Sequence, residues 1–109
     1  MNVQIEGRHL KITDAIQERV HEKVDSLTKY FDGLHHVRVI LIVENPTRMR
    51  AEVVCGVIRG QQLVTKAEHE DLYAAVDEAV RKARELLKRY KDRLRSRKGG
   101  QKPPMVPAS

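Results

Sequence analysis

The chain has 109 residues, of which 33% are charged and 40% apolar, with one cysteine and no tryptophan. That length supports one folded domain, and the single cysteine excludes an intrachain disulfide framework and a multi-cysteine zinc site. The formal net charge of +6 is uneven, because residues 79–98 hold ten basic and two acidic side chains whereas residues 1–78 hold ten basic and thirteen acidic ones.

A short strand and a helix are predicted first. Val3 and Ile5 alternate with polar residues, which is the period of a strand with one buried face. Apolar residues then recur at steps of three and four over residues 14–31, the spacing of an amphipathic helix. Thr13 or Asp14 is expected to cap this helix at its N-terminus.

Three strands are predicted next. Gly33 is expected to end the first helix in the left-handed conformation. β-branched residues then predict a central strand over residues 36–44, followed by strands over 50–58 and 61–68. Arg59-Gly60 has the composition of a tight hairpin turn between the last two strands.

The longest predicted element is a helix over residues 71–95. Its apolar side chains share one face at ~100° per residue; they are Leu72, Val76, Ala79, Val80, Ala83, Leu87, Tyr90 and Leu94. Residues 96–109 have no periodicity and contain three prolines and two glycines. We therefore expect a domain over residues 1–95 and a basic, disordered tail over 96–109.

Basic side chains flank the apolar face of this helix on both sides. One row comprises Arg81, Arg84, Lys88, Lys91 and Arg95, and the other comprises Lys82, Arg89 and Arg93. At ~1.5 Å per residue these rows could present cations to phosphates over roughly 20 Å. A solvated helix face is the simpler alternative, but ten basic residues in twenty positions exceed what solubility requires.

The element order β-α-β-β-β-α predicts an α+β fold. The first helix is long enough for a crossover that sets the first strand parallel to the second, and the later hairpins are antiparallel. Both helices should cover one face of a four-stranded sheet, giving a two-layer sandwich similar to the double-stranded-RNA-binding domain. Ile40 and Ile42 would then leave apolar surface on the open sheet face, which is the basis of an alternative function as a protein-interaction module.

Two features that the chain lacks narrow the class of nucleic acid that it could bind. All four aromatic residues fall on predicted helices, so the sheet offers no aromatic platform for stacking single-stranded bases. No GxxG pair is present to clamp a backbone. Recognition of phosphates and shape in structured RNA remains, and a general structured-RNA-binding domain is therefore a second alternative.

Catalysis and metal binding are not predicted. His35 and His36 are adjacent in a predicted strand and would point to opposite faces. Cys55 lies on an apolar strand face and is expected to be a buried hydrophobe rather than a nucleophile. Glu70 or Asp71 is expected to cap the second long helix and to complement its dipole.

The sequence resembles the short ribosome hibernation promoting factors, also called ribosome-associated inhibitors or protein Y. The resemblance covers residues 1–95 and rests on four segments. These are Ile12-Thr13 through Ile16, Lys29-Tyr30-Phe31-Asp32, His69-Glu70-Asp71-Leu72-Tyr73-Ala74-Ala75-Val76-Asp77 and Lys91-Asp92-Arg93-Leu94.

The resemblance implies a cytoplasmic, non-enzymatic protein that binds 16S rRNA of the small ribosomal subunit. Such factors occupy the channel used by mRNA and tRNA and silence idle ribosomes under stress or in stationary phase. Lys82, Arg89 and Arg93 match basic family positions, as does Lys23 on the first helix. Where the family often has a basic residue at position 85, this chain has Arg84 followed by Glu85, so the row with Arg81, Arg84, Lys88 and Lys91 is also a candidate.

The resemblance also implies what the protein does without. No cofactor, metal ion, membrane or small-molecule substrate is expected. Long members of the family add a C-terminal dimerisation domain that pairs two ribosomes. The fourteen residues from Ser96 are too few to form one, so pairing by that route is not expected.

Overall fold

The computed structural model describes residues 2–98, with side chains described as far as residue 94. Its elements are β1 (Asn2–Arg8), α1 (Asp14–Tyr30), β2 (Leu34–Asn45), β3 (Arg48–Val57), a short 3-10 turn η1 (Ile58–Gly60), β4 (Gln62–His69) and α2 (Leu72–Lys98). The predicted α+β class and the β-α-β-β-β-α order are both confirmed.

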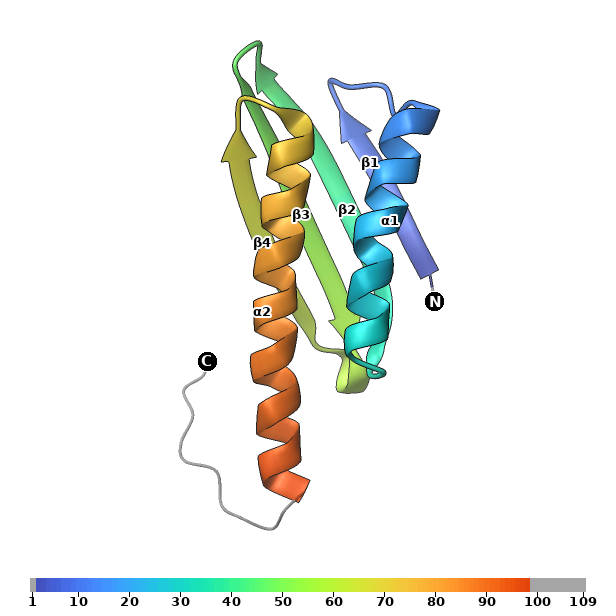
Figure 1. Cartoon of the computed structure of the whole chain (residues 1–109), viewed down its shortest axis with the longest axis vertical. Coiled ribbons are helices and arrows are strands. Elements are labelled where there is room, and N and C mark those ends of the chain that lie inside the picture. The colour runs from blue at the N-terminus through green and yellow to red at the C-terminus, as the bar shows by residue number, and fades with distance from the viewer. Residues whose placement is uncertain (1, 99–109) are drawn as a thin grey trace.

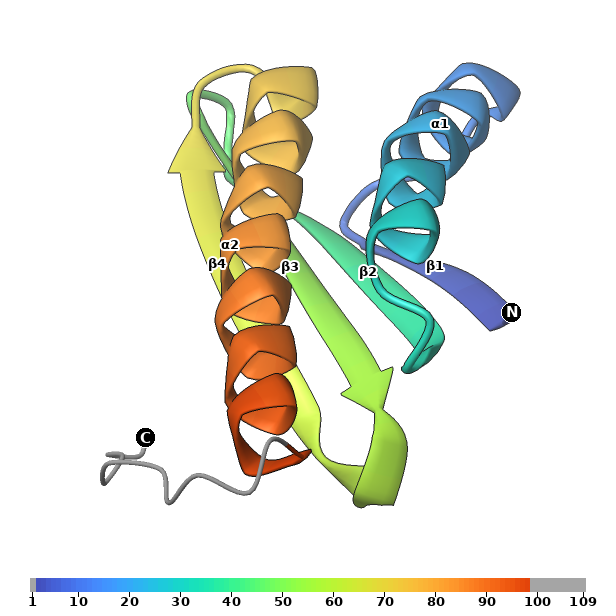
Figure 2. The same ribbon diagram turned by 60° about the horizontal axis from the view of Figure 1, so that its bottom comes forward.

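The four strands form one sheet in the order β1-β2-β3-β4. β1 is parallel to β2, as the crossover through α1 requires, and Ile5 lies beside Val39 in that pair. The other two pairs are antiparallel, with Val39 beside Val53 and Val53 beside Thr65. Both helices lie on the same face of the sheet, α1 over the β1–β2 side and α2 over the β3–β4 side (Figures 1 and 2).

Thr13 begins α1, since its hydroxyl oxygen accepts a hydrogen bond from the amide of Ile16 at 3.2 Å. The prediction that Gly33 ends α1 in the left-handed conformation was wrong. Among the glycines of residues 2–98 only Gly60 has a positive φ, so Gly33 is not left-handed. A Cβ at Gly33 would instead run into the ring of Phe31, so this position needs a residue without a side chain for lack of space.

The core lies between the sheet and the two helices. Val20 and Val24 of α1 and Leu87 of α2 are almost fully buried against the inward-facing side chains of β2 and β3. Two hydrogen bonds fix α2, one to strand β4 and one to the turn η1 between β3 and β4. The Thr65 hydroxyl donates to the Ala79 carbonyl at 2.8 Å, and the Tyr90 hydroxyl donates to the Ile58 carbonyl at 3.3 Å. The predicted apolar face of this helix is confirmed.

The opposite face of the sheet differs from the expectation. Ile40 and Ile42 are only 4% and 7% exposed, so the predicted open apolar surface is wrong. Each isoleucine lies between charged residues of the neighbouring strands, Glu52 beside Ile40 and Arg50 beside Ile42. Arg50 pairs with Glu52 at 3.4 Å, and long charged side chains of this kind cover apolar surface with their methylene stems. Among the described residues, Val64 is the only exposed large hydrophobic side chain.

The end of α2 also needs a correction. The helix continues to Lys98, three residues beyond the predicted end, because Ser96-Arg97-Lys98 contains no helix breaker and the first glycine is at position 99. The rest of the predicted tail, residues 99–109, lies outside the described residues. The last turns of α2 extend past the end of the sheet (Figure 1). Within residues 2–98, none of the helices has the length and apolar character needed to cross a bilayer.

Candidate nucleic-acid interface

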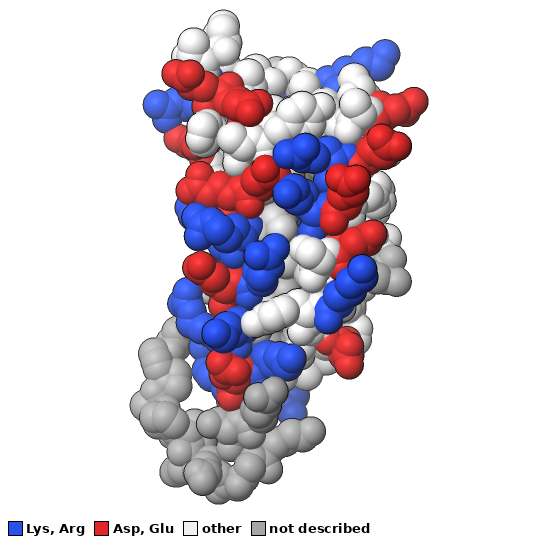
Figure 3. Space-filling model, viewed as in Figure 1, with Lys and Arg blue, Asp and Glu red and all other residues white. Residues whose placement is uncertain are grey.

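Lys and Arg side chains gather along α2 on the helical side of the molecule and are densest toward its C-terminal end (Figure 3). Acidic side chains interrupt them without breaking the run into separate patches. The basic residues of α2 fall into two rows on opposite flanks of its buried stripe, as the helical spacing predicts. The contacts of each row show which neighbour it faces.

We call Lys82, Arg89 and Arg93 the edge ridge, because they flank α2 on the side of β4, the edge strand of the sheet. The Lys82 ammonium donates a hydrogen bond to the Lys66 carbonyl of β4 at 3.0 Å and lies 3.6 Å from the Glu78 carboxylate. Arg89 and Arg93 are exposed, and no side chain within residues 2–94 forms an ion pair with either. The Arg93 guanidinium lies 6.0 Å from the ring centre of Tyr90.

We call Arg81, Arg84, Lys88 and Lys91 the groove ridge, because this row faces α1. Arg84 contacts the Ser26 hydroxyl of α1 at 3.4 Å. The Lys91 ammonium donates to the Tyr30 carbonyl at the end of α1, also at 3.4 Å, and lies 5.5 Å from the centre of the Tyr30 ring. A cation at this carbonyl is favourable, since the C-terminus of a helix carries partial negative charge.

The groove ridge therefore turns part of its charge inward. Arg81 pairs with Glu85 on the next turn at 3.4 Å, and an exposed i,i+4 pair of this kind contributes about 0.3–0.5 kcal/mol. Lys88 is exposed and has no ion-pair partner among the described side chains. Of the two rows, the edge ridge has the guanidinium groups that are more available to bind an external phosphate.

Lys23 of α1, a candidate by family resemblance, lies across the groove from α2. Its ammonium is 3.5 Å from the Asp77 carboxylate, and the guanidinium of Arg19 is 3.2 Å from the same carboxylate. The Arg19 guanidinium also lies over the Tyr73 ring, 5.3 Å from its centre. We call Arg19, Lys23 and Asp77 the interhelix cluster.

The interhelix cluster was missed in the sequence. Arg19 and Asp77 are 58 residues apart, so only the packing of α1 beside α2 brings them together. One signal was available, because Arg19 and Lys23 are four residues apart on one flank of α1 and Asp77 precedes the groove ridge on α2. Using that signal requires knowing which flanks of the two helices face each other.

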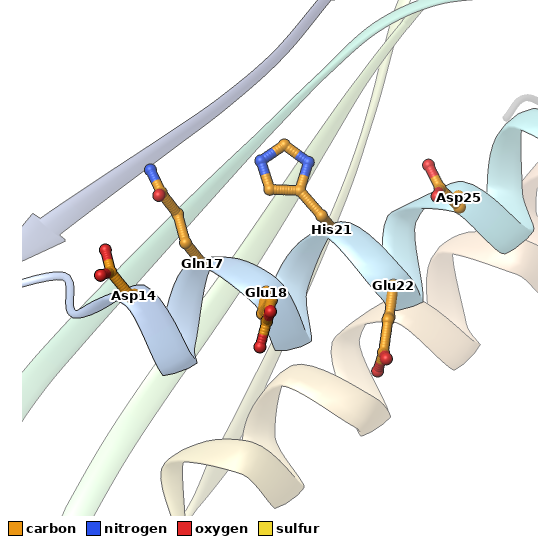
Figure 4. A pocket seen from close by; sticks show the side chains of 6 residues that line it. All are labelled: Asp14, Gln17, Glu18, His21, Glu22 and Asp25. Atoms are coloured by element: carbon orange, nitrogen blue, oxygen red, sulfur yellow. The ribbon is translucent and has the colours of Figure 1, made fainter.

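The outer side of α1 has the opposite charge. A shallow hollow there is lined by Asp14, Gln17, Glu18, His21, Glu22 and Asp25. Figure 4 shows that all six side chains come from α1, with Glu18 and Glu22 pointing away from Gln17 and His21. Four carboxylates in this hollow would repel a polyanion, so the candidate phosphate-binding surface is limited to α2 and the flank of α1 that faces it.

The remaining chemically reactive side chains lie apart from this surface. Cys55 is fully buried in the core, and burial raises the pKa of its thiol to about 11, which keeps it protonated and unreactive at neutral pH. The His36 imidazole lies against Gly56 on the open face of the sheet. Within residues 2–98, His, Cys, Asp and Glu side chains form no group of three or more that could hold a metal ion.

A two-layer α+β sandwich with one strongly basic helix has the features of a small phosphate-binding domain. Comparison with known families makes the assignment more specific. Residues 3–95 match the family model described as sigma 54 modulation protein / S30EA ribosomal protein. The chain belongs to this family, and the resemblance seen in its sequence is confirmed.

Curated relatives cover nearly the whole chain. The ribosome hibernation promoting factor of Azotobacter vinelandii is 38% identical over 103 residues, which are 94% of this chain and 94% of that protein. The ribosome hibernation promoting factor of Escherichia coli K12 is 34% identical over 95 residues, 87% of this chain and 98% of that protein.

Two solved structures share the fold. The N-terminal domain of Thermus thermophilus Protein Y superposes with a TM-score of 0.74 at 36% identity, covering 83% of this chain and 99% of that domain. A ribosomal subunit interface protein from Coxiella burnetii superposes with a TM-score of 0.73 and covers 84% of this chain and 99% of its own. At 23% identity, the second likeness concerns the fold alone.

Proposed function

We propose that this protein is a ribosome hibernation factor that docks on the 16S rRNA of the small ribosomal subunit. There it occupies the channel used by mRNA and tRNA and silences idle ribosomes under stress or in stationary phase. Family membership and the names of the relatives support the ribosomal role. The proposed docking surface rests on one observation, the edge ridge. Its cations lie on a rigid helix and have few ion-pair partners among the described side chains.

The mechanism is steric and electrostatic. Arg89 and Arg93 offer planar guanidinium forks that can bind a phosphate through two hydrogen bonds, and Lys82 supplies a point charge about two turns before Arg89. Because α2 is seated on the sheet by the Thr65 and Tyr90 hydrogen bonds, these cations move as one body. Contacts to phosphates fix position and register, and the folded domain then excludes mRNA and tRNA by its bulk.

The groove ridge and Lys23 support the same surface from the other flank of α2. Arg84 and Lys91 hold α1 against α2, and the whole row, with Arg81 and Lys88, adds positive charge beside the edge ridge. The protein acts in the cytoplasm, where ribosomes are, and needs no cofactor, metal or catalytic residue for this role.

Co-sedimentation with separated ribosomal subunits tests the proposal. The purified protein is pelleted with small or large subunits at two salt concentrations, with tRNA and duplex RNA as competitors. We expect saturable, near-stoichiometric pelleting with the small subunit alone. Phosphate contacts should make binding fall with salt at a log–log slope of about −0.7 to −0.9 per contact.

Each other outcome would have a definite meaning. Equal capture by duplex RNA would demote the protein to a general structured-RNA binder, which the phosphate-directed chemistry of α2 also favours. Selective pelleting with the large subunit would overturn the assignment of the small subunit. Absence of salt-sensitive pelleting would remove α2 as the docking surface.

A further inference from the structure

Asp77 is the one carboxylate in the described part of the chain that contacts cations of both kinds from the opposite helix. It lies at the start of the groove side of α2, where the Arg19 guanidinium and the Lys23 ammonium approach it from α1 at 3.2 and 3.5 Å. The three side chains are about 40% exposed, so the cluster is open to a ligand from solvent. Stacking of Arg19 on Tyr73 adds a second restraint to the guanidinium.

The charges of the interhelix cluster do not cancel. One carboxylate faces two cations, which leaves an excess of one positive charge at the groove. The Nε atom of Arg19 is buried and has no hydrogen-bond partner among the described atoms, and its Nη2 atom is committed to Asp77. The Lys23 side chain is 39% exposed, so its ammonium could bind a phosphate oxygen while Asp77 keeps its contacts.

We propose that Asp77 is a positioning residue that makes the docking surface selective for structured rRNA over RNA in general. It holds Arg19 and Lys23 of α1 at a fixed distance from the basic rows of α2, so that cations from two helices match phosphates in one arrangement. This role rests on the proposed function. It adds that the cations fixed by Asp77 favour one folded RNA over others.

Asp77 orders the cations around it but also lowers the positive charge there. Long cationic side chains lose rotamer freedom when they bind, and a partner that orders them beforehand removes part of that loss. Asp77 provides such order, but its negative charge weakens the attraction of the groove for any polyanion. An RNA whose phosphates fit the fixed cations gains from the order, whereas a flexible or ill-matched RNA experiences only the lost charge.

The test compares Asp77→Asn with Glu85→Gln. Both changes remove one negative charge from α2, but Glu85 pairs only with Arg81 of its own helix among the described residues. We expect Asp77→Asn to weaken binding to the small subunit about three- to fivefold, the loss implied by one or two exposed ion pairs, while binding to duplex RNA strengthens slightly. Glu85→Gln should strengthen both slightly.

Asp77→Glu serves as the conservative variant and should restore most of the selectivity. If Asp77→Asn and Glu85→Gln change the two affinities alike, Asp77 is one charge among many and the proposal is overturned. A wild-type protein without preference for the small subunit would overturn the proposed function itself, and this role with it.

A measurement without ribosomes tests the ordering step separately. Nitrogen-15 relaxation at the Arg19 Nε–H group reports the mobility of the guanidinium in the free protein. We expect this group to be ordered in the wild type and in Glu85→Gln, and mobile in Asp77→Asn. Equal mobility in all three would overturn the positioning role even if the small subunit is bound as proposed. Circular dichroism of each variant separates these effects from loss of the fold.

Discussion

The two ridges of α2 carry the same kind of side chain at the same helical spacing, yet their neighbours differ. The groove ridge reaches Ser26 and Tyr30 of α1 and holds the two helices together. In the edge ridge, only Lys82 reaches the sheet, and Arg89 and Arg93 project into solvent. The difference shows that basic residues counted equally in a sequence have different surroundings in the fold, one row in contact with α1 and the other largely exposed to solvent.

Reversing the charge of the edge ridge should have the largest effect on ribosome binding. We expect Lys82→Glu, Arg89→Glu and Arg93→Glu together to weaken small-subunit binding by about a hundredfold or more, at roughly 1 kcal/mol for each lost phosphate contact. Titration of labelled protein with small subunits at fixed salt measures the loss.

A matched control reverses three exposed basic residues away from the edge ridge, Lys11, Lys29 and Arg38, which changes the net charge equally. We expect it to lose far less affinity than the edge-ridge variant. Equal losses would mean that net charge, rather than the edge ridge, governs docking. If the edge-ridge variant binds the small subunit normally and a variant with the groove ridge reversed does not, the assignment of the two rows is reversed.

Neutralising the groove ridge should have a smaller effect on binding and a larger one on stability. Arg84→Gln, Lys88→Gln and Lys91→Gln together remove the contacts to α1, including the cation at the end of that helix. We expect about 1 kcal/mol less stability, against about 0.5 kcal/mol or less for Gln at the three edge positions. Urea unfolding monitored by circular dichroism measures both, and equal losses would remove the distinction between the ridges.

The buried Cys55 thiol should respond least to either set of changes, and it serves as a check on the fold. Its pKa is raised from 9.0 to about 11 in the folded protein, so unfolded chains lose the proton first as pH rises. Stability should be unaffected by this group below pH 9 and fall by about 1.4 kcal/mol per pH unit between pH 9 and 11.

Thiol labelling at pH 8 should be slow in the wild type and equally slow in both ridge variants. Cys55→Ala should lack the alkaline loss of stability that this group causes. Fast labelling of one ridge variant would show that its core has opened, and its loss of ribosome binding would then say nothing about docking.

Most of the fold could be predicted because its signals are local. The two periodicities, three to four residues in the helices and two in the strands, mark the elements, and Thr13 marks the start of α1. Predictions were wrong where the outcome depended on how particular side chains pack against one another. Gly33 is required by the ring of Phe31 rather than by its own φ, and Ile40 is covered by side chains from neighbouring strands.

The candidate site likewise has some features that the sequence predicts and others that depend on packing. The two basic rows follow from helical geometry and could be read from residues 79–98 alone. The direction each row faces could not, because it depends on contacts such as Lys82 with Lys66 and Arg84 with Ser26. The interhelix cluster joins Arg19 and Asp77, which are 58 residues apart in the chain. Both residues can be seen in the sequence, but their proximity cannot.

The bond from Lys82 to the Lys66 carbonyl also affects how copies of the protein meet one another. β4 is an edge of the sheet, and an edge strand is a place where a second chain can add its own strand and begin to aggregate. The Lys82 ammonium occupies one carbonyl of that edge and sets a positive charge beside it. A side chain proposed to bind rRNA thus also discourages self-association while the protein is free of its partner.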